Sequence, residues 1–216
     1  MTLTSDAKFV IGILLATCIV IGAGAWITNL RSKPAPAKTV SASQMDLLVR
    51  SDAPASGPSD AKVTVVEFGD FECPACGALY PAFKQVMQAD QNKSVRFIFR
   101  NYPLPQHSFA PLAAEAALFA QAQNKFWEYH DILFEHQDNL AQSDLEGYAK
   151  QLGFDSTAFS NALNNHTYKP TVDRDLADGA ALGLDHTPTV FINGTEYTGD
   201  YSADQFSSAI DAALAK

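Results

Sequence analysis

The sequence is poor in cysteine and carries no excess of positive charge. Its 216 residues include only three cysteines, and the formal net charge is −9. So few cysteines exclude a small domain held together by several disulfides. An acidic chain is a poor binder of nucleic acid, so we expect no nucleic-acid partner. Hydrophobic residues make up 47% of the chain, which is enough for the core of one ordinary domain with extensions.

Two of the three cysteines form a Cys-x-x-Cys motif, Cys73 to Cys76, with the sequence CPAC. The apolar, β-branched run from Val63 to Phe68 precedes it and predicts a buried strand. Apolar side chains at helical spacing follow it, at Leu79, Phe83, Val86 and Met87. A strand that leads into Cys-x-x-Cys at the start of a helix is typical of a thioredoxin-like redox site.

The start of a helix favours this chemistry. Unpaired N–H groups and the positive end of the helix dipole stabilise a thiolate, so the pKa of Cys73 should fall. Pro74 suits the first helical turn, where its missing N–H costs little. Cys73 is then the predicted exposed nucleophile and Cys76 the shielded resolving thiol. The alternative is half of a structural zinc site, but zinc usually takes four ligands and the third cysteine, Cys18, lies in an apolar N-terminal segment. We therefore expect no metal and no organic cofactor.

Charge is also absent from residues 9–30, and an apolar helix of this length would span the hydrocarbon core of a membrane. We expect residues 1–30 to form an uncleaved signal anchor and single membrane pass. The alternative is a cleaved signal peptide, with Lys8 before the apolar run and Ala23-Gly24-Ala25 as the cleavage site. Cys18 lies within this run and is interpreted as one of its small apolar residues.

The charges around this segment oppose an exported domain, because Lys8 precedes it whereas Arg31, Lys33 and Lys38 follow it. We nevertheless predict export, since an apolar N-terminal segment before a redox domain fits an extracytoplasmic role. Residues 31–60 are rich in Pro, Ala and Ser and are expected to be a linker. Within them, Leu47-Leu48-Val49 could add an edge strand or pack on the domain.

The remainder, residues 61–216, is expected to be one α/β domain. The run from Val95 to Arg100 predicts a second strand, parallel to the first. Residues of about 108–183 show helical periodicity almost throughout. Val190 to Ile192 predicts a further strand, and Asn193-Gly194 predicts a tight hairpin turn after it.

These features together resemble the DsbA-like thioredoxin family of extracytoplasmic thiol:disulfide oxidoreductases. The resemblance covers about residues 50–216 and rests on the segments EFGDFECPAC, NKFWEYHDILFEHQ and HTPTVFING. It implies a thioredoxin fold with an inserted helical subdomain at about 108–183, which the helical periodicity also indicates.

The resemblance also implies roles for three residues outside the Cys-x-x-Cys motif. Pro188 matches the family's cis-proline, which lies against the motif and leaves the backbone of Thr187 free to bind a substrate peptide. Glu67 matches a buried acid whose pKa is raised by burial and which could accept the proton of Cys76. The alternatives are an ordinary trans proline at a strand start and a carboxylate that reaches solvent.

The sequence departs from the family at two positions. Ala75 stands where some members have a histidine that stabilises the thiolate, so we expect a less oxidising couple here. His186 stands where the family often has glycine, and we hypothesise that it approaches Cys73 and partly replaces the missing imidazole. The other histidines show no ligand spacing and are assigned structural or surface roles; they are His107, His130, His136 and His166.

The predicted function is a thiol:disulfide oxidase that introduces disulfides into reduced exported proteins. A membrane quinone-linked thiol oxidase is the reoxidising partner that the resemblance implies. The alternatives are a reductase or isomerase with the same site, and a non-catalytic thioredoxin-like binding or chaperone module.

Overall fold

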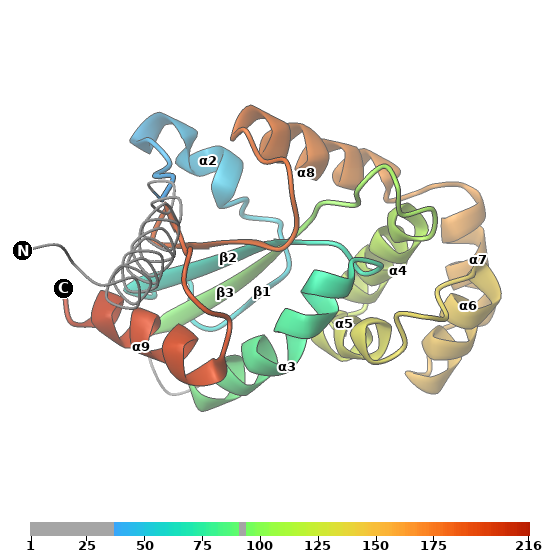
Figure 1. Ribbon diagram of the computed structural model, residues 1–216. Helices are drawn as coiled ribbons and strands as arrows, with labels where there is room; N and C mark the ends of the chain where they lie inside the picture. The colour runs from blue at the N-terminus through green and yellow to red at the C-terminus, as the bar shows by residue number, and fades with distance from the viewer. Residues whose placement is uncertain (1–36, 91–93) are drawn as a thin grey trace, which may run out of the picture. The chain divides into compact units, whose positions relative to one another are not determined.

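Two parallel strands, β2 (Val63–Gly69) and β3 (Val95–Asn101), lie at the centre of the fold, and α3 (Pro74–Ala89) connects them (Figure 1). A computed structural model describes residues 37–90 and 94–216 of the chain. Parallel neighbours need a crossover connection, and here the crossover is the helix that carries the Cys-x-x-Cys motif. The β–α–β unit predicted from the sequence is therefore confirmed.

Three shorter strands complete the sheet, whose order is β1-β3-β2-β4-β5. β4 (Thr189–Ile192) pairs antiparallel with β2, β5 (Thr195–Glu196) with β4, and β1 (Ala55–Ser56) with β3. Asn193 and Gly194 connect β4 to β5 with φ angles of 47° and 78°. Two successive positive φ angles are those of a type I′ turn, so the hairpin predicted from Asn-Gly is confirmed.

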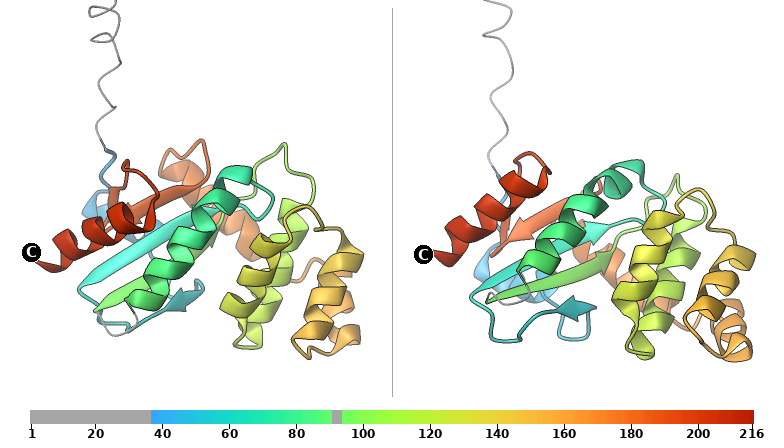
Figure 2. Two further views of the ribbon diagram at one scale, coloured as in Figure 1. Left: turned by 60° about the horizontal axis from the view of Figure 1, so that its bottom comes forward. Right: turned by 90° about the horizontal axis from the view of Figure 1, so that it is seen from below.

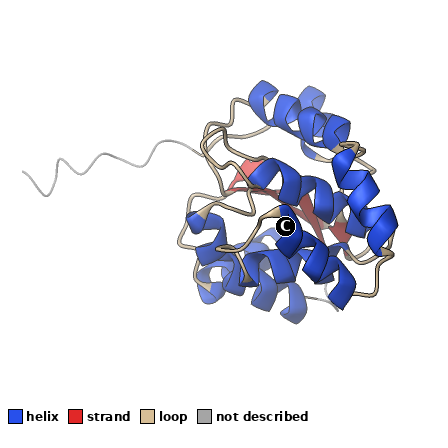
Figure 3. Ribbon diagram, turned by 90° about the vertical axis from the view of Figure 1, so that its right-hand side faces the viewer, coloured by secondary structure: helices blue, strands red, loops and turns tan. Residues whose placement is uncertain are grey.

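Helices cover both faces of the sheet, as Figure 3 shows with the strands enclosed between them. Val63 and Val65 of β2 face α3 and α9 (Ala203–Leu214), whereas Val66 and Phe68 face the opposite side. That second face is covered by α2 (Met45–Leu48), which follows the short η1 (Ala42–Gln44), and by α8 (Lys169–Ala181). Because successive side chains of a strand point to opposite faces, the sheet carries a separate apolar cluster on each face.

The helical region between β3 and β4 is an insertion into this α/β unit. Four helices gather beyond one end of the sheet before α8 returns over it (Figure 2). Their bounds are α4 Ala110–Ala122, α5 Phe126–Glu135, α6 Gln142–Gln151 and α7 Ser156–Asn164. Their apolar cluster continues to Phe71 and the two motif cysteines, so the insertion forms one wall of the redox site. His130 of α5 is buried among aromatic rings there, in the structural role expected for it.

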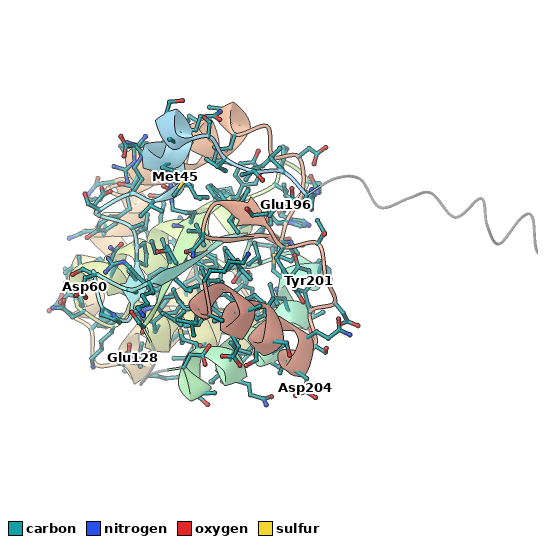
Figure 4. All side chains as sticks on the ribbon, turned by 90° about the vertical axis from the view of Figure 1, so that its left-hand side faces the viewer. Met45, Asp60, Glu128, Glu196, Tyr201 and Asp204 are labelled. Carbon is teal, nitrogen blue, oxygen red and sulfur yellow. The ribbon has the colours of Figure 1, made fainter. Side chains whose placement is uncertain are left out.

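The segment from residue 37 to 60 belongs to the domain, so the linker predicted for residues 31–60 is wrong over this part. Val40 N–H donates to Gly194 O at 2.8 Å and Glu196 N–H donates to Lys38 O at 2.7 Å. Leu48 is fully buried, and β1 extends the sheet. Figure 4 shows Met45 on this segment. A few buried apolar side chains and backbone hydrogen bonds are enough to hold this segment on the domain, although its composition is rich in Pro, Ala and Ser.

The predicted membrane segment, residues 9–30, lies outside the described residues. Within residues 37–90 and 94–216, no helix is long and apolar enough to cross a membrane.

A buried arginine ties the insertion to the sheet. Arg100 of β3 is fully buried and lies on the face covered by α8. Its Nε donates to Asp175 Oδ1 at 3.0 Å and its Nη2 to Asp178 Oδ2 at 2.6 Å. Its Nη1 donates to the carbonyl oxygens of Leu47 and Leu48 at 2.6 and 3.1 Å. One guanidinium therefore joins β3, α8 and α2, with its donors matched in a way that a buried charge requires.

Replacing Arg100 by leucine should destabilise the fold strongly, because it leaves buried Asp175 without its main counter-charge and leaves Asp178 with Arg50 alone. We expect a loss of about 3–5 kcal/mol in the free energy of unfolding, measured by urea denaturation. The matched control is Lys169→Met, which removes an exposed pair with Asp173 and should cost less than about 0.5 kcal/mol. Equal costs for the two variants would contradict this account.

Candidate functional site

The Cys-x-x-Cys motif lies at the N-terminus of α3, as predicted. Cys73 is the N-cap residue with an extended backbone, and Pro74 is the first helical residue. Both cysteines are free thiols. Cys76 is fully buried and Cys73 is only 6% exposed, so the expected exposed nucleophile is more enclosed than the sequence suggested. Pro74 and Ala75 are the exposed part of the motif.

Thr187 lies against the motif, although it is 114 residues from Cys73 in the sequence. Cys73 Sγ donates to Thr187 O at 3.5 Å, and the Thr187–Pro188 peptide bond is cis, as the resemblance implied. Thr187 is buried, and its hydroxyl Oγ1 has no hydrogen-bond partner among the described residues. The hydroxyl is therefore available to a sulfur that becomes a thiolate.

The pKa values of the two thiols are shifted in opposite directions. A hydrogen bond from Cys76 lowers the pKa of Cys73 to about 5; the Thr187 side chain and the N–H groups of Cys76 and Ala75 contribute, against the effect of burial. Burial, above all, raises the pKa of Cys76 far above its ordinary value, and the hydrogen bond to Cys73 adds to this. At neutral pH the site thus holds one thiolate and one thiol, which is the state that thiol–disulfide exchange needs.

Glu67 lies on the same face of β2 as the residues that contact α3, and it is 2% exposed. Burial raises the pKa of its carboxyl to about 8, and the Cys73 thiolate adds to the effect. The expected buried acid is therefore present, and the alternative of a carboxylate that reaches solvent is wrong. Glu67 is coupled to Cys76, whose pKa its charge raises.

Tyr201 approaches the same buried region from the loop before α9, where Figure 4 labels it. Burial raises the pKa of its phenol, and the charges of Glu67 and Cys76 contribute. A lone tyrosine between a hairpin and a helix gives no functional signal in the sequence, so this neighbour was not predicted.

One side chain that the sequence did not point to holds the loop around Cys73. Gln137, between α5 and α6, donates from Nε2 to Phe71 O at 2.8 Å and to Cys73 O at 3.0 Å. Gly77 makes this approach possible, because a Cβ there would overlap with the Gln137 amide. The two contacts join positions 66 and 64 residues apart, so no local sequence pattern signals them.

The hypothesised contact of His186 with Cys73 remains a prediction. His186 Nδ1 lies 2.9 Å from Asp185 Oδ1, and 59% of its side chain is exposed. A different imidazole is coupled to the thiolate, that of His107 in the loop after β3, whose pKa is raised in part by the charge of Cys73. His107 had been assigned a structural or surface role.

No group of three or more potential metal-ligating side chains occurs within residues 37–90 and 94–216. A cavity of about 840 Å³ lies beside the site, between α4, α8 and the loop after β3. Leu104, Leu112, Val172 and Leu176 line its apolar part, with His107 and Asp185 also on its wall.

Comparison with known proteins places this geometry in a family. The family model described as "Thioredoxin" matches residues 50–212. The structure of oxidised BdbD from Bacillus subtilis aligns with a TM-score of 0.71 and 25% identity, over 85% of this chain and 100% of that chain. A thioredoxin-like oxidoreductase from Silicibacter pomeroyi aligns with a TM-score of 0.69 and 26% identity, over 79% of this chain and 98% of that chain.

A relative of a different name is closer in sequence. A protein of Salinispora arenicola named Na(+)/H(+) antiporter NhaA 1 is 39% identical over 95% of this chain, and the match covers 33% of the relative. The chain therefore spans about a third of the length of this curated relative.

The inserted helices, the cis Thr187–Pro188 bond against the motif and the family match agree with one another. The fold is thus the α/β thioredoxin fold with an inserted helical region that the resemblance implied. The chain belongs to the thioredoxin family, in its DsbA-like group of thiol:disulfide oxidoreductases.

Proposed function

We propose that this protein is a thiol:disulfide oxidase that passes the Cys73–Cys76 disulfide to reduced substrate proteins. The observation that carries the proposal is the opposite displacement of the two thiol pKa values. A thiolate that is stabilised in the reduced enzyme makes the reduced form more favourable, so the oxidised form is a better electron acceptor.

The reaction takes place in two exchanges. A substrate thiolate attacks Cys73 Sγ of the oxidised enzyme, the Cys73–Cys76 bond breaks, and Cys76 leaves as a thiolate that takes up a proton. A second substrate thiolate then attacks the substrate sulfur of the mixed disulfide and releases Cys73 as a thiolate. The substrate loses two electrons and the enzyme gains them. Glu67, protonated at neutral pH, supplies the proton for Cys76 and recovers it when the enzyme is reoxidised.

The name of the Salinispora relative does not alter this proposal. The match covers 95% of this chain, and so most of the segment that the thioredoxin family model matches, but only a third of the relative. We assign to this chain the redox chemistry of the matched part, and we leave ion transport to the relative.

The direction of the reaction is tested by the reduction potential of the protein, equilibrated with reduced and oxidised glutathione and analysed by thiol trapping. We expect a potential above about −200 mV, at the oxidising end of known dithiol proteins. Cys73→Ser should abolish exchange. Cys76→Ser should accumulate a mixed disulfide when it is given a disulfide-bonded peptide, because the Cys73 thiolate opens the peptide disulfide, releases one peptide thiolate and has no Cys76 to resolve the new bond. A potential well below that of glutathione would instead indicate a reductase. Absence of any exchange would favour a non-catalytic binding module.

Glu67→Gln should slow the exchange without preventing it. The amide cannot transfer a proton to or from Cys76, so we expect about a hundredfold lower rate of peptide oxidation. The rate is measured by stopped-flow fluorescence at pH 7, with Asp173→Asn on the exposed surface of α8 as control. A rate equal to that of the wild type would remove Glu67 from the mechanism.

The same variant should be more stable than the wild type at high pH. The folded protein holds the Glu67 proton up to about pH 8, whereas the unfolded chain releases it near its ordinary pKa of 4.5. Wild-type stability therefore falls as pH rises from about 4.5 to 8, and the uncharged amide of the variant escapes this loss. The displacement of this pKa from 4.5 to about 8 corresponds to roughly 5 kcal/mol. The disulfide form lacks the Cys73 thiolate that contributes to it, so we expect Glu67→Gln to gain about 3–5 kcal/mol at pH 9 and nothing at pH 4, in urea denaturation of the oxidised protein. A gain independent of pH would contradict the buried ionisation.

We further propose that the domain lies outside the cytoplasm, tethered by residues 1–30, that its substrates are reduced exported proteins, and that a membrane quinone-linked thiol oxidase reoxidises it. Protease added to intact spheroplasts should then digest the domain. Protection until the cells are lysed would overturn the proposed location.

A further inference from the structure

A buried carboxylate lies directly before the motif, on the connection from β2 to α3. Asp70 is 1% exposed. Its Oδ1 accepts from Glu72 N–H at 2.8 Å, and its Oδ2 accepts from Leu104 N–H at 2.8 Å. Its Oδ2 also lies 2.7 Å from His107 Nδ1. Asp70 can thus accept a hydrogen bond from His107 Nδ1, and this hydrogen bond orients the imidazole ring.

The backbone of Asp70 is also hydrogen-bonded to that of the nucleophile, since Cys73 N–H donates to Asp70 O at 3.1 Å. Two short connections therefore hold His107 in the neighbourhood of Cys73. The side chain of His107 is 16% exposed, so the ring is partly withdrawn from solvent and its charge is incompletely screened.

The electrostatics agree with this placement. Burial alone would lower the pKa of His107, but the hydrogen bond to Asp70 and the charges of Asp70, Cys73 and Glu72 outweigh it and raise the pKa above 6.5. An interaction between two charges is reciprocal, so an imidazolium that the thiolate stabilises must stabilise the thiolate by the same free energy. This contribution is smaller than that of the hydrogen bonds to Cys73, which are the principal causes of its lowered pKa.

We propose that His107, oriented by Asp70, stabilises the Cys73 thiolate of the reduced enzyme and so takes the place of the imidazole that Ala75 lacks. The inference rests on the proposed redox function of the Cys73–Cys76 pair. Reduction adds two electrons and one proton to the disulfide, and yields a thiolate at Cys73 and a thiol at Cys76. A positive charge beside Cys73 favours this product, so it makes the couple more oxidising. His107 acts here as a positioning residue, because it touches Asp70 rather than the sulfur.

Several other charged groups face the space around His107, and the experiment must separate them. Asp70 and Glu72 come from the β2–α3 connection. The cavity that His107 lines also contains charged side chains from α4, from the loop before α8, from α8 and from the loop after it: Glu115, His166, Lys169, Asp173 and Asp185. His166 is the best control among them, since its Nδ1 lies 2.9 Å from Glu115 Oε1 in a second histidine–carboxylate pair.

The direct test is an NMR titration of the histidine rings in the wild-type protein, in the disulfide and dithiol states. His107 should titrate at a higher pH in the dithiol state, in which Cys73 is a thiolate, and the His166 ring is followed as the control. Equal titration of His107 in the two states would overturn the proposal, whatever the direction of the overall reaction. A potential below that of glutathione would overturn the oxidase but leave this coupling intact.

Variants give the reciprocal measurement. His107→Gln keeps a hydrogen-bond donor but loses the charge, so thiolate absorbance at 240 nm should show an acid dissociation constant for Cys73 about threefold lower. The potential should fall by about 14 mV, which is the same threefold change for a two-electron couple. His107→Lys should restore both values, and His166→Gln should change neither. If His186→Gln moves the Cys73 titration and His107→Gln does not, the assignment to His107 is wrong.

Discussion

A charge withdrawn from water constrains this fold more than any other single contact. Arg100 is fully buried, and two carboxylates of α8 and two carbonyl oxygens of α2 surround it. An unpaired guanidinium at that position would be prohibitively unfavourable, so β3, α8 and α2 can only assemble together. The loop that leaves α8 carries Thr187 to Cys73. The buried ion cluster therefore fixes one side of the redox site from the opposite face of the sheet.

The neighbouring strand carries a buried charge of the other kind. Glu67 of β2 and Arg100 of β3 are close in register, since Glu67 is opposite Phe99 and Phe68 is opposite Arg100. The period of two turns the two side chains to opposite faces, so the arginine cannot neutralise the glutamate. Burial and the Cys73 thiolate both raise the pKa of Glu67. The sheet thus lies between two buried charges of different kinds. Arg100 is compensated by its carboxylate partners, whereas Glu67 has no counter-charge and, by our proposal, transfers a proton in the exchange reaction.

How far the sequence predicts this structure depends on how local each signal is. The strand, the Cys-x-x-Cys helix start and the Asn-Gly hairpin are encoded by consecutive residues, and all three are confirmed. Residues 37–60 were wrongly expected to be a linker from their composition, but the apolar run Leu47-Leu48-Val49 was a correct local signal, since Leu48 packs in the core. His107 lies 37 positions from Asp70, with which it pairs, so only the folded chain brings the two together. His186 attracted the functional hypothesis because it stands next to Thr187-Pro188 in sequence, yet its ring turns to Asp185.

The oxidising character that we propose for the site is explained by donors that only a thiolate at Cys73 satisfies. In the dithiol, the buried Thr187 hydroxyl has no hydrogen-bond partner among the described residues. Leaving such a donor unpaired costs about 1–3 kcal/mol, and a thiolate at Cys73 relieves this cost. The Cys76 thiol acts in the same direction and so, by our proposal, does His107. Several groups together then stabilise the Cys73 thiolate, which in some family members is stabilised by a histidine within the motif. For this reason Ala75 is compatible with a strongly lowered pKa at Cys73. If the proposed function holds, the loss of one contributor should lower the reduction potential without abolishing exchange.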